Sequence, residues 1–231
     1  MRYGSGCDPL CTAPVPAPFP NAALVGPLAL AARGLACQRG DRLLFQALDF
    51  ELRDGQILWL RGANGRGKTS LLRLVAGLSR PAAGTIERPG VHAERRMVYI
   101  AHANALKDDL SALENLQFLA RLHGDDDGEA PCSEALRRFG LLSRRRAAVR
   151  TLSQGQRRRV ALARLLLARP QTLWVLDEPF DALDTEGIAT LDEVLAAHAR
   201  AGGAVVLTSH LELTVHDPEP VCLQLDAVAV Q

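Results

Sequence analysis

The sequence predicts an α/β fold built around a parallel sheet. Short apolar runs at residues 173–176 and 204–208 are separated by the helical pattern of residues 185–199. Strands that alternate with helices in this way are typical of parallel sheets with crossover connections. A chain of 231 residues with 48% hydrophobic composition is also large and apolar enough to bury the core of one ordinary domain.

The remaining elements follow from the spacing of the apolar residues. Residues 28–37 and 45–52 alternate between apolar and polar side chains, as antiparallel strands do. The spacing of apolar residues within 103–150 favours helices, and we expect this stretch to form a helical insert. In chain order the prediction is strands over 28–37, 45–52 and 56–61, a helix over 67–78, a strand over 97–101, helices over 112–122, 133–142 and 156–168, a strand over 173–176, a helix over 185–199 and a strand over 204–208.

Residues 1–28 are expected to be a disordered extension, and residues 29–231 the folded domain. The uncharged stretch 9–32 resembles a membrane segment in composition, but it contains six prolines. Each proline removes a backbone N–H donor and breaks a helix sterically, so a spanning helix is excluded there. No other segment approaches spanning length, and we expect no bilayer crossing by this chain.

The charge balance argues against a nucleic-acid partner. The chain carries 27 Lys and Arg against 26 Asp and Glu, a net charge of +1, and only 4% aromatic residues. Binding along a nucleic-acid backbone needs a basic surface, and stacking on bases needs aromatic rings. We interpret the arginine runs 144–146 and 157–159 as solvated faces. We likewise expect His92, His123, His198 and His216, which belong to no motif, at the surface.

One segment matches the phosphate-binding pattern G-x-x-x-x-G-K-[ST] between a predicted strand and a predicted helix. Its glycines let successive N–H groups point at phosphate oxygens, and the helix start adds a positive dipole end. Lys68 is expected on the outer phosphates of ATP, and the Thr69 hydroxyl on Mg²⁺. The predicted phosphate-binding residues are Gly62, Ala63, Asn64, Gly65, Arg66, Gly67, Lys68, Thr69 and Ser70.

Two carboxylates, Asp177 and Glu178, end the apolar strand 173–176. Ligands of parallel α/β sheets bind at the carboxyl ends of the strands, which is where this pair is expected. We predict that Asp177 holds Mg²⁺ through water, together with Thr69. Glu178 is predicted to orient and deprotonate the water that attacks the γ-phosphate.

Three further motifs resemble those of ABC ATPases, a family of phosphate-loop NTPases. Leu152 and the four residues after it resemble the LSGGQ signature, with Gln154 in place of one glycine. Asp184 closes a segment similar to the D-loop, and His210 follows an apolar strand like the switch histidine. The signature residues that the resemblance identifies are Ser153, Gln154, Gly155 and Gln156.

This resemblance implies a specific architecture and a homodimer. The nucleotide-binding domain of the family has a RecA-like parallel-sheet core, an antiparallel β subdomain and a helical subdomain insert, here at about 103–150. In the family, residues 153–156 would meet the γ-phosphate held by the opposite protomer, Asp184 would cross the dimer interface, and His210 would contact the γ-phosphate.

Two positions depart from the general family pattern. His102 stands where the Q-loop glutamine is expected, after the strand 97–101. Arg39 stands near the position of the aromatic residue that stacks on adenine. The resemblance implies that His102 contacts the metal-bound water or senses a partner. It implies that Arg39 stacks on adenine through its guanidinium plane.

Other segments resemble the ATP-binding subunits of cytochrome c maturation ABC transporters. They include residues 38–45, 101–107, 156–164 and 176–184. The resemblance implies a polytopic, CcmB-like membrane partner and a peripheral position on the cytoplasmic face of the bacterial inner membrane. It implies that ATP hydrolysis drives haem export or the release of a haem-loaded chaperone. We expect no direct haem binding by this chain.

Three alternative functions are compared by the motifs that each would require. The ATPase of another ABC exporter would share the motifs above. A non-transport ABC ATPase would carry two such domains or a long heptad insert, and 85 residues without sustained heptads separate Lys68 from Ser153. A phosphate-loop kinase or GTPase would not need the signature or the strand before His210.

Overall fold

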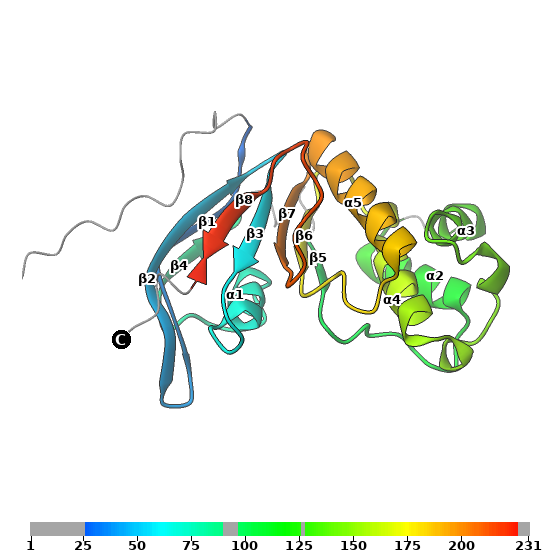
Figure 1. The fold of residues 1–231 in the computed structure, drawn as a ribbon, viewed down its shortest axis with the longest axis horizontal. Helices are drawn as coiled ribbons and strands as arrows, with labels where there is room; N and C mark the ends of the chain where they lie inside the picture. Colours follow the sequence, from blue (N-terminus) through cyan, green and yellow to red (C-terminus); the bar gives the residue numbers. More distant parts are fainter. Residues whose placement is uncertain (1–25, 90–96, 126–127, 226–231) are drawn as a thin grey trace, which may run out of the picture.

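The computed structural model describes residues 26–89, 97–125 and 128–225, which form two sheets and a group of helices (Figure 1). The antiparallel sheet lies at one end, the parallel sheet in the middle and the helical part at the other end. Residues 1–25 of the predicted extension and His92, predicted at the surface, lie outside the described residues. Of the described helices, none has the length and apolar character that crossing a membrane requires.

The antiparallel sheet has the strand order β2-β1-β4. Strands β1 (Leu28–Arg39) and β2 (Arg42–Arg53) form a hairpin in which Arg39 is paired with Arg42. Strand β4 (Ala83–Glu87) was not predicted, because it is short and largely exposed and therefore shows no clear alternation. The hairpin tip carries Arg39 and Arg42 to the neighbourhood of the phosphate loop, where both line one cavity.

The parallel sheet has the order β5-β6-β7-β3-β8, and all its pairings are parallel. The two central strands β6 and β7 are buried along their whole length, as expected for strands covered on both faces. The edge strand β8 was not predicted from the sequence. The strands are β5 (Met97–Ile100), β6 (Leu173–Leu176), β7 (Ala204–Thr208), β3 (Ile57–Arg61) and β8 (Val221–Gln224).

Two hydrophobic clusters cover the two faces of the parallel sheet. Val206 packs with helix α1 (Lys68–Val75) and the antiparallel sheet, whereas Val205 and Leu207 pack with the helical side. This alternation is the period-two pattern of a strand buried on both faces. Because all strands run in the same direction, β3, β6 and β7 end at one edge, and the segments after them meet there.

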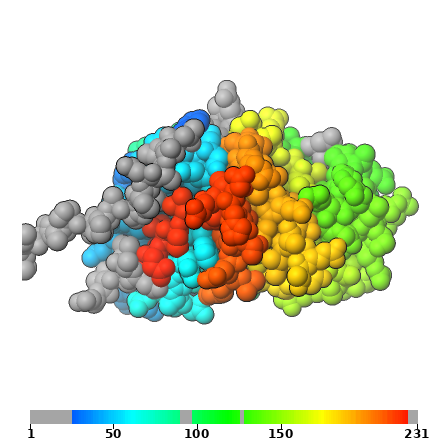
Figure 2. Space-filling view, turned by 45° about the horizontal axis from the view of Figure 1, so that its top comes forward, coloured from blue at the N-terminus to red at the C-terminus, as the bar shows by residue number. Residues whose placement is uncertain are grey.

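The helical part is built from three helices and short 3₁₀ turns beside helix α5 (Thr185–Arg200). Figure 2 shows it in green at one end of the molecule, with α5 in orange between it and the strands. Helix α3 begins four residues earlier than predicted, and α4 ends at Ala163 and continues as a 3₁₀ turn. The elements are α2 (Ala112–His123), α3 (Glu129–Arg138), α4 (Gln154–Ala163) and the turns Leu142–Arg144, Val149–Thr151 and Arg164–Leu167.

His198 is buried, so its predicted surface position is wrong. Its side chain is 7% exposed, and its ring stacks on Trp174 with centroids 3.5 Å apart. A ring nitrogen lies 2.8 Å from the Thr172 carbonyl oxygen. A Cβ on Gly203 would lie 2.1 Å from the His198 ring, which explains why glycine occupies that position. The histidine therefore fills a core gap between α5 and β6.

Candidate functional site

A cavity of about 390 Å³ opens where β3, β6 and β7 end. This volume is within the range of small-molecule sites in proteins. Most of its lining residues are polar or charged, and they come from four separate stretches of the chain. The lining residues are Arg39, Arg42, Leu44, Asn64, Gly65, Gly67, Lys68, Thr69, Ser70, Glu178 and His210.

The phosphate loop, residues 62–69, connects the end of β3 to the start of α1. Gly67 precedes the helix with a φ of 97°, a left-handed conformation that glycine adopts without steric cost. Helix α1 has no side-chain cap and no acidic residue in its first turn. Its first N–H groups and the positive end of its dipole therefore face the cavity without a competing side-chain acceptor.

Lys68 lies folded against the loop. Its side chain is 8% exposed, and its ammonium donates a hydrogen bond of 2.7 Å to the Gly62 carbonyl oxygen. An ammonium has three donors, so this bond leaves donors for another acceptor. Lys68 is one of the cavity-lining residues. The arrangement places a positive charge beside the phosphate loop and the uncapped start of α1, which is suited to a polyphosphate.

Asp177, directly after β6, is bonded to the start of α1 and to the end of β7. Its Oδ1 accepts a hydrogen bond of 3.2 Å from the Thr69 hydroxyl and one of 2.9 Å from the Thr208 hydroxyl. Thr208 ends the buried strand β7, and its role was not predicted from the sequence. The sequence feature that could have predicted this role is a polar residue at the end of an otherwise apolar strand. A carboxylate and a hydroxyl at this spacing are oxygen donors of the kind Mg²⁺ uses beside phosphate and water ligands.

Glu178 points into the cavity from the end of β6. Its N–H donates a bond of 2.8 Å to the Thr208 hydroxyl. Its Oε2 accepts a bond of 3.1 Å from the His210 N–H, and its Oε1 lies 3.5 Å from His210 Nε2. Its φ is 46°, which is uncommon for a residue with a side chain. The carboxylate thus faces Lys68 and Thr69 across the same cavity.

The signature residues lie outside this cavity. Ser153 is exposed at the start of α4, where its side chain accepts from the Gln156 N–H and Gln156 bonds back to the Ser153 N–H. Gly155 lies against the turn before α5, since a Cβ there would be 2.7 Å from the Ala182 carbonyl oxygen. None of these residues lines the cavity that holds Lys68. The structure therefore brings the signature and the phosphate loop to different places within one chain.

Asp184 and His102 are both exposed. The Asp184 side chain caps α5 through the Gly187 N–H at 2.9 Å and pairs with Arg159 at 3.2 Å. His102 is 74% exposed, and its Nδ1 lies 3.5 Å from Asp181 Oδ2 rather than at the cavity. Arg39, in contrast, lines the cavity, and so does Arg42, which the sequence did not suggest.

Arg158 contradicts the interpretation of residues 157–159 as a solvated face. Its side chain is 2% exposed, and its guanidinium reaches from α4 to the segment around Asp177 and Glu178. The three arginines are consecutive on a helix, so each points in a different direction. Only the middle one faces the sheet, which sequence composition alone does not reveal.

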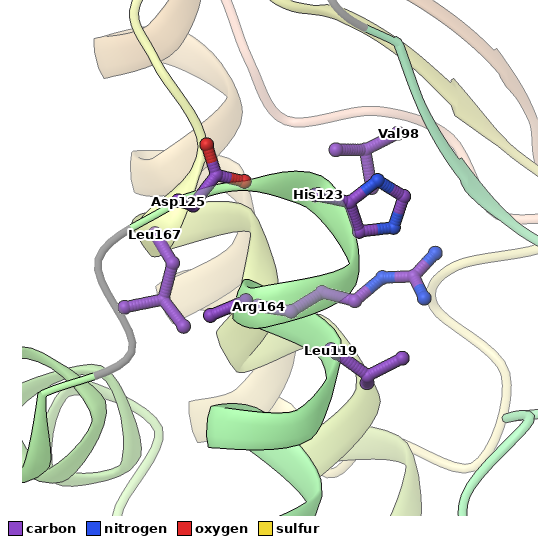
Figure 3. Close-up of a pocket in the computed structure, with 7 residues that line it drawn as sticks. Val98, Leu119, His123, Asp125, Arg164 and Leu167 are labelled. Atoms are coloured by element: carbon purple, nitrogen blue, oxygen red, sulfur yellow. The ribbon is translucent and has the colours of Figure 1, made fainter.

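A second, much smaller cavity lies between α2, β5 and the 3₁₀ turn after α4 (Figure 3). Its volume is about 10 Å³, room for roughly one water molecule. Arg164 extends along it beside His123 and donates to the Tyr99 carbonyl oxygen. Burial lowers the pKa of Arg164 to about 10. This cavity is too small for a nucleotide, and the larger one remains the candidate site.

Comparisons with known proteins agree with this geometry. The sequence profile described as "ABC transporter" matches residues 45–181. The "Cytochrome c biogenesis ATP-binding export protein CcmA" of Aromatoleum aromaticum is 47% identical over 209 residues, which cover 87% of this chain and 96% of that relative. The protein of the same name from Pseudomonas putida (strain GB-1) is 53% identical over 190 residues, covering 79% and 90%.

A solved structure has the same fold. A putative ABC transporter ATP-binding protein from Pyrococcus furiosus superposes with a TM-score of 0.76 at 24% identity, covering 87% of this chain and 99% of that chain. This likeness supports the predicted fold class: a parallel-sheet core with an antiparallel sheet and a helical part.

Proposed function

We infer the function from the premise that the chain belongs to the ABC transporter family and, within it, to the CcmA proteins of cytochrome c biogenesis. It is an ATPase, the ATP-binding subunit of an export system for cytochrome c biogenesis. The observation that carries this conclusion is the cavity in which Lys68, Thr69, Glu178 and His210 meet. One side of it is suited to a polyphosphate and the other to activation of water.

We propose that the phosphate loop binds the phosphates of ATP. The inward-facing N–H groups of residues 62–70 would hold the phosphate oxygens, and Lys68 would neutralise the outer ones. Arg39, at the mouth of the cavity, would stack on the adenine through its planar guanidinium. Arg42 lies beside it and adds a second positive charge at the same entrance.

Glu178 is proposed as the general base and His210 as its partner. The carboxylate would accept a proton from the attacking water, while the His210 contacts keep it oriented toward the γ-phosphate. Thr69 and Asp177 would hold Mg²⁺, because together they offer a hydroxyl and a carboxylate oxygen beside the cavity. When bound, Mg²⁺ would offset the charge of the phosphate oxygens.

A second copy of the chain would complete the site. Ser153 and Gln154 are exposed, Gly155 and Gln156 are partly exposed, and none of them lines the cavity of its own chain, which favours a role toward a nucleotide held by the partner copy. Asp184, exposed at the start of α5, would face the same partner. The proposed homodimer would bind two ATP molecules, each between one phosphate loop and the other copy's signature.

The proposed membrane partner is a polytopic, CcmB-like subunit, and the proposed location is the cytoplasmic face of the bacterial inner membrane. The exposed segment that begins with His102 would sense this partner. A mild-detergent pull-down of the tagged chain tests the assignment. We expect a membrane subunit of the haem pathway to co-purify, whereas a drug- or lipid-exporter permease would overturn the assignment to cytochrome c biogenesis.

Glu178→Gln tests the catalytic assignment. The amide keeps the size of the side chain but cannot accept the water proton, so hydrolysis should fall by about 100-fold or more while ATP still binds. A dimer with trapped ATP should accumulate, measurable by size-exclusion chromatography with labelled nucleotide. Hydrolysis at the wild-type rate by the variant would show that Glu178 is not the base.

A further inference from the structure

Arg158 is a buried cation that joins three parts of the molecule. From α4 it reaches the end of β6 and the loop that follows β5. A buried charge is costly unless its donors are satisfied, and here each of the three guanidinium nitrogens donates. The acceptors are the carbonyl oxygens of Pro179 (3.3 Å), Ala101 (3.0 Å), Asp177 (3.0 Å) and Glu178 (2.7 Å), and Asn104 Oδ1 (3.0 Å).

Arg158 contacts Glu178 at a residue whose backbone is strained. Glu178 has a φ of 46°, a conformation that persists in a residue with a Cβ only when its surroundings hold it. The Thr208 hydroxyl holds the Glu178 N–H, and Arg158 Nη2 holds its carbonyl oxygen. The peptide groups on both sides of the Glu178 Cα are thereby fixed, and with them the direction in which the side chain leaves the backbone; the His210 contacts then hold the carboxylate itself.

The charge of Arg158 is matched by nearby carboxylates. Burial lowers the pKa of Arg158, while Asp181, Asp177 and Glu178 act in the opposite direction. A guanidinium stays protonated in proteins under these conditions. Its planar fork can serve several acceptors in fixed directions, which a lysine ammonium cannot do.

The remaining contacts reach the loop after β5. Ala101 and Asn104, which both accept from Nη1, flank His102, and the His102 ring lies 3.5 Å from Asp181. We propose that Arg158 is a positioning residue for ATP hydrolysis: it aims the Glu178 carboxylate and makes that aim depend on the position of the loop 101–104. The proposal rests on the assignment of Glu178 as the base.

Arg158→Lys is the decisive variant, tested in the detergent-purified complex with the membrane partner. The positive charge remains, but the fork that reaches five acceptors is lost. We expect kcat for ATP hydrolysis to fall roughly 10- to 100-fold, as misplaced catalytic groups do, with KM for ATP changed less than about 3-fold. Arg137→Lys, the same change at the exposed Arg137–Glu134 pair of α3, should leave both values unchanged.

A double variant separates positioning from general destabilisation. If Arg158 acts through the Glu178 carboxylate, adding Arg158→Lys to Glu178→Gln should lower the residual rate no further. An additive loss, or a wild-type kcat for Arg158→Lys while Glu178→Gln is inactive, overturns the proposal and leaves the base assignment intact. Wild-type hydrolysis by Glu178→Gln overturns the base assignment itself.

A milder variant covers the case in which Arg158→Lys does not fold, as judged by thermal unfolding. Asn104→Ala removes one acceptor from the guanidinium and leaves the other four. We expect kcat to fall a few-fold at unchanged KM. Unchanged kcat in this folded variant would count against the link between the loop and Glu178.

Discussion

Two helix starts in this molecule offer N–H groups to an anion, and they differ in what surrounds them. The start of α1 has no side-chain cap and opens on the cavity that Lys68, Glu178 and His210 line. The start of α4 is closed by a capping box between Ser153 and Gln156 and lies in solvent, outside that cavity. Under the proposed function, the start of α1 would bind ATP within its own chain, and the start of α4 would face ATP held by a second copy.

The two helix starts differ in which groups surround them, and this difference decides what each would need in order to bind a phosphate. At α1 the positive charge, the carboxylate and the backbone donors come from one chain. At α4 the helix start is preformed by its own cap, and under the proposed function a second copy would supply the phosphate. The predictions below separate the two helix starts, beginning with the largest expected effect.

Lys68→Met should abolish the α1 half of the site. Removing a charged donor from a phosphate cradle costs about 3 kcal/mol, so ATP affinity should fall about 100-fold or more, measured by titration with a fluorescent ATP analogue. The chain has one other lysine, Lys107, which provides the matched control. Lys107 lies over the Phe118 ring, away from the cavity, and Lys107→Met should bind ATP normally.

Ser153→Ala should affect the α4 half without affecting ATP binding. Loss of the cap costs roughly 1 kcal/mol of stability. Loss of a hydroxyl that meets a phosphate should lower hydrolysis by a further ~10-fold. Ser111 caps α2 with the same capping box, so Ser111→Ala is the control. Equal stability losses with unequal ATPase rates are expected; equal rates in the two variants would mean that Ser153 is only a cap.

Gln156→Glu tests why the capping box at the start of α4 pairs Ser153 with an uncharged glutamine. Glutamate serves a capping box at least as well as glutamine, so thermal stability should be retained or rise. Its negative charge would face the phosphate from the partner copy, and we expect hydrolysis to fall about 3- to 10-fold. The loss should shrink at high salt, because exposed charges are screened. An unchanged rate at low salt would argue against a phosphate next to this helix start.

Glu114→Gln makes the opposite substitution, glutamate to glutamine, in the capping box of α2, and we expect its effect to be the smallest. The Ser111 N–H and hydroxyl donate to the Glu114 carboxylate and hold its pKa below the ordinary value. A lowered folded-state pKa means that this stabilisation is present above the unfolded-state pKa and is lost as pH falls through the folded-state pKa. The melting temperature of the wild type should exceed that of the variant at pH 7, and the difference should vanish on acidification. A difference independent of pH would contradict this.

The fold could be predicted where periodicity is strong. The hairpin of β1 and β2 and the buried strands β6 and β7 follow from alternation and apolar runs. Strand β4 is mostly exposed and β8 is a four-residue edge strand, so neither has a pattern that distinguishes it from a loop. Their place depends on pairing with β1 and β3, which lie far away in the sequence.

The site could be predicted where a motif specifies its own backbone. The phosphate loop needs its glycines and its lysine in fixed order, and of these Gly65, Gly67 and Lys68 line the cavity. Arg158 and Thr208 carry no such motif. Arg158 is one of three adjacent arginines, and only the orientation of α4 against β6 makes it the buried one. Side-chain direction on a helix depends on packing, which residue composition does not contain.

The close approach of Gly155 to the Ala182 carbonyl oxygen has a mechanical consequence. Any side chain at residue 155 would push the start of α4 away from the turn that leads to Asp184. Because the two stretches touch at this point, we expect a displacement of the start of α4 to displace the turn that leads to Asp184 as well. If a second copy contacts either stretch, the start of α4 and the turn before Asp184 would move together rather than as separate loops.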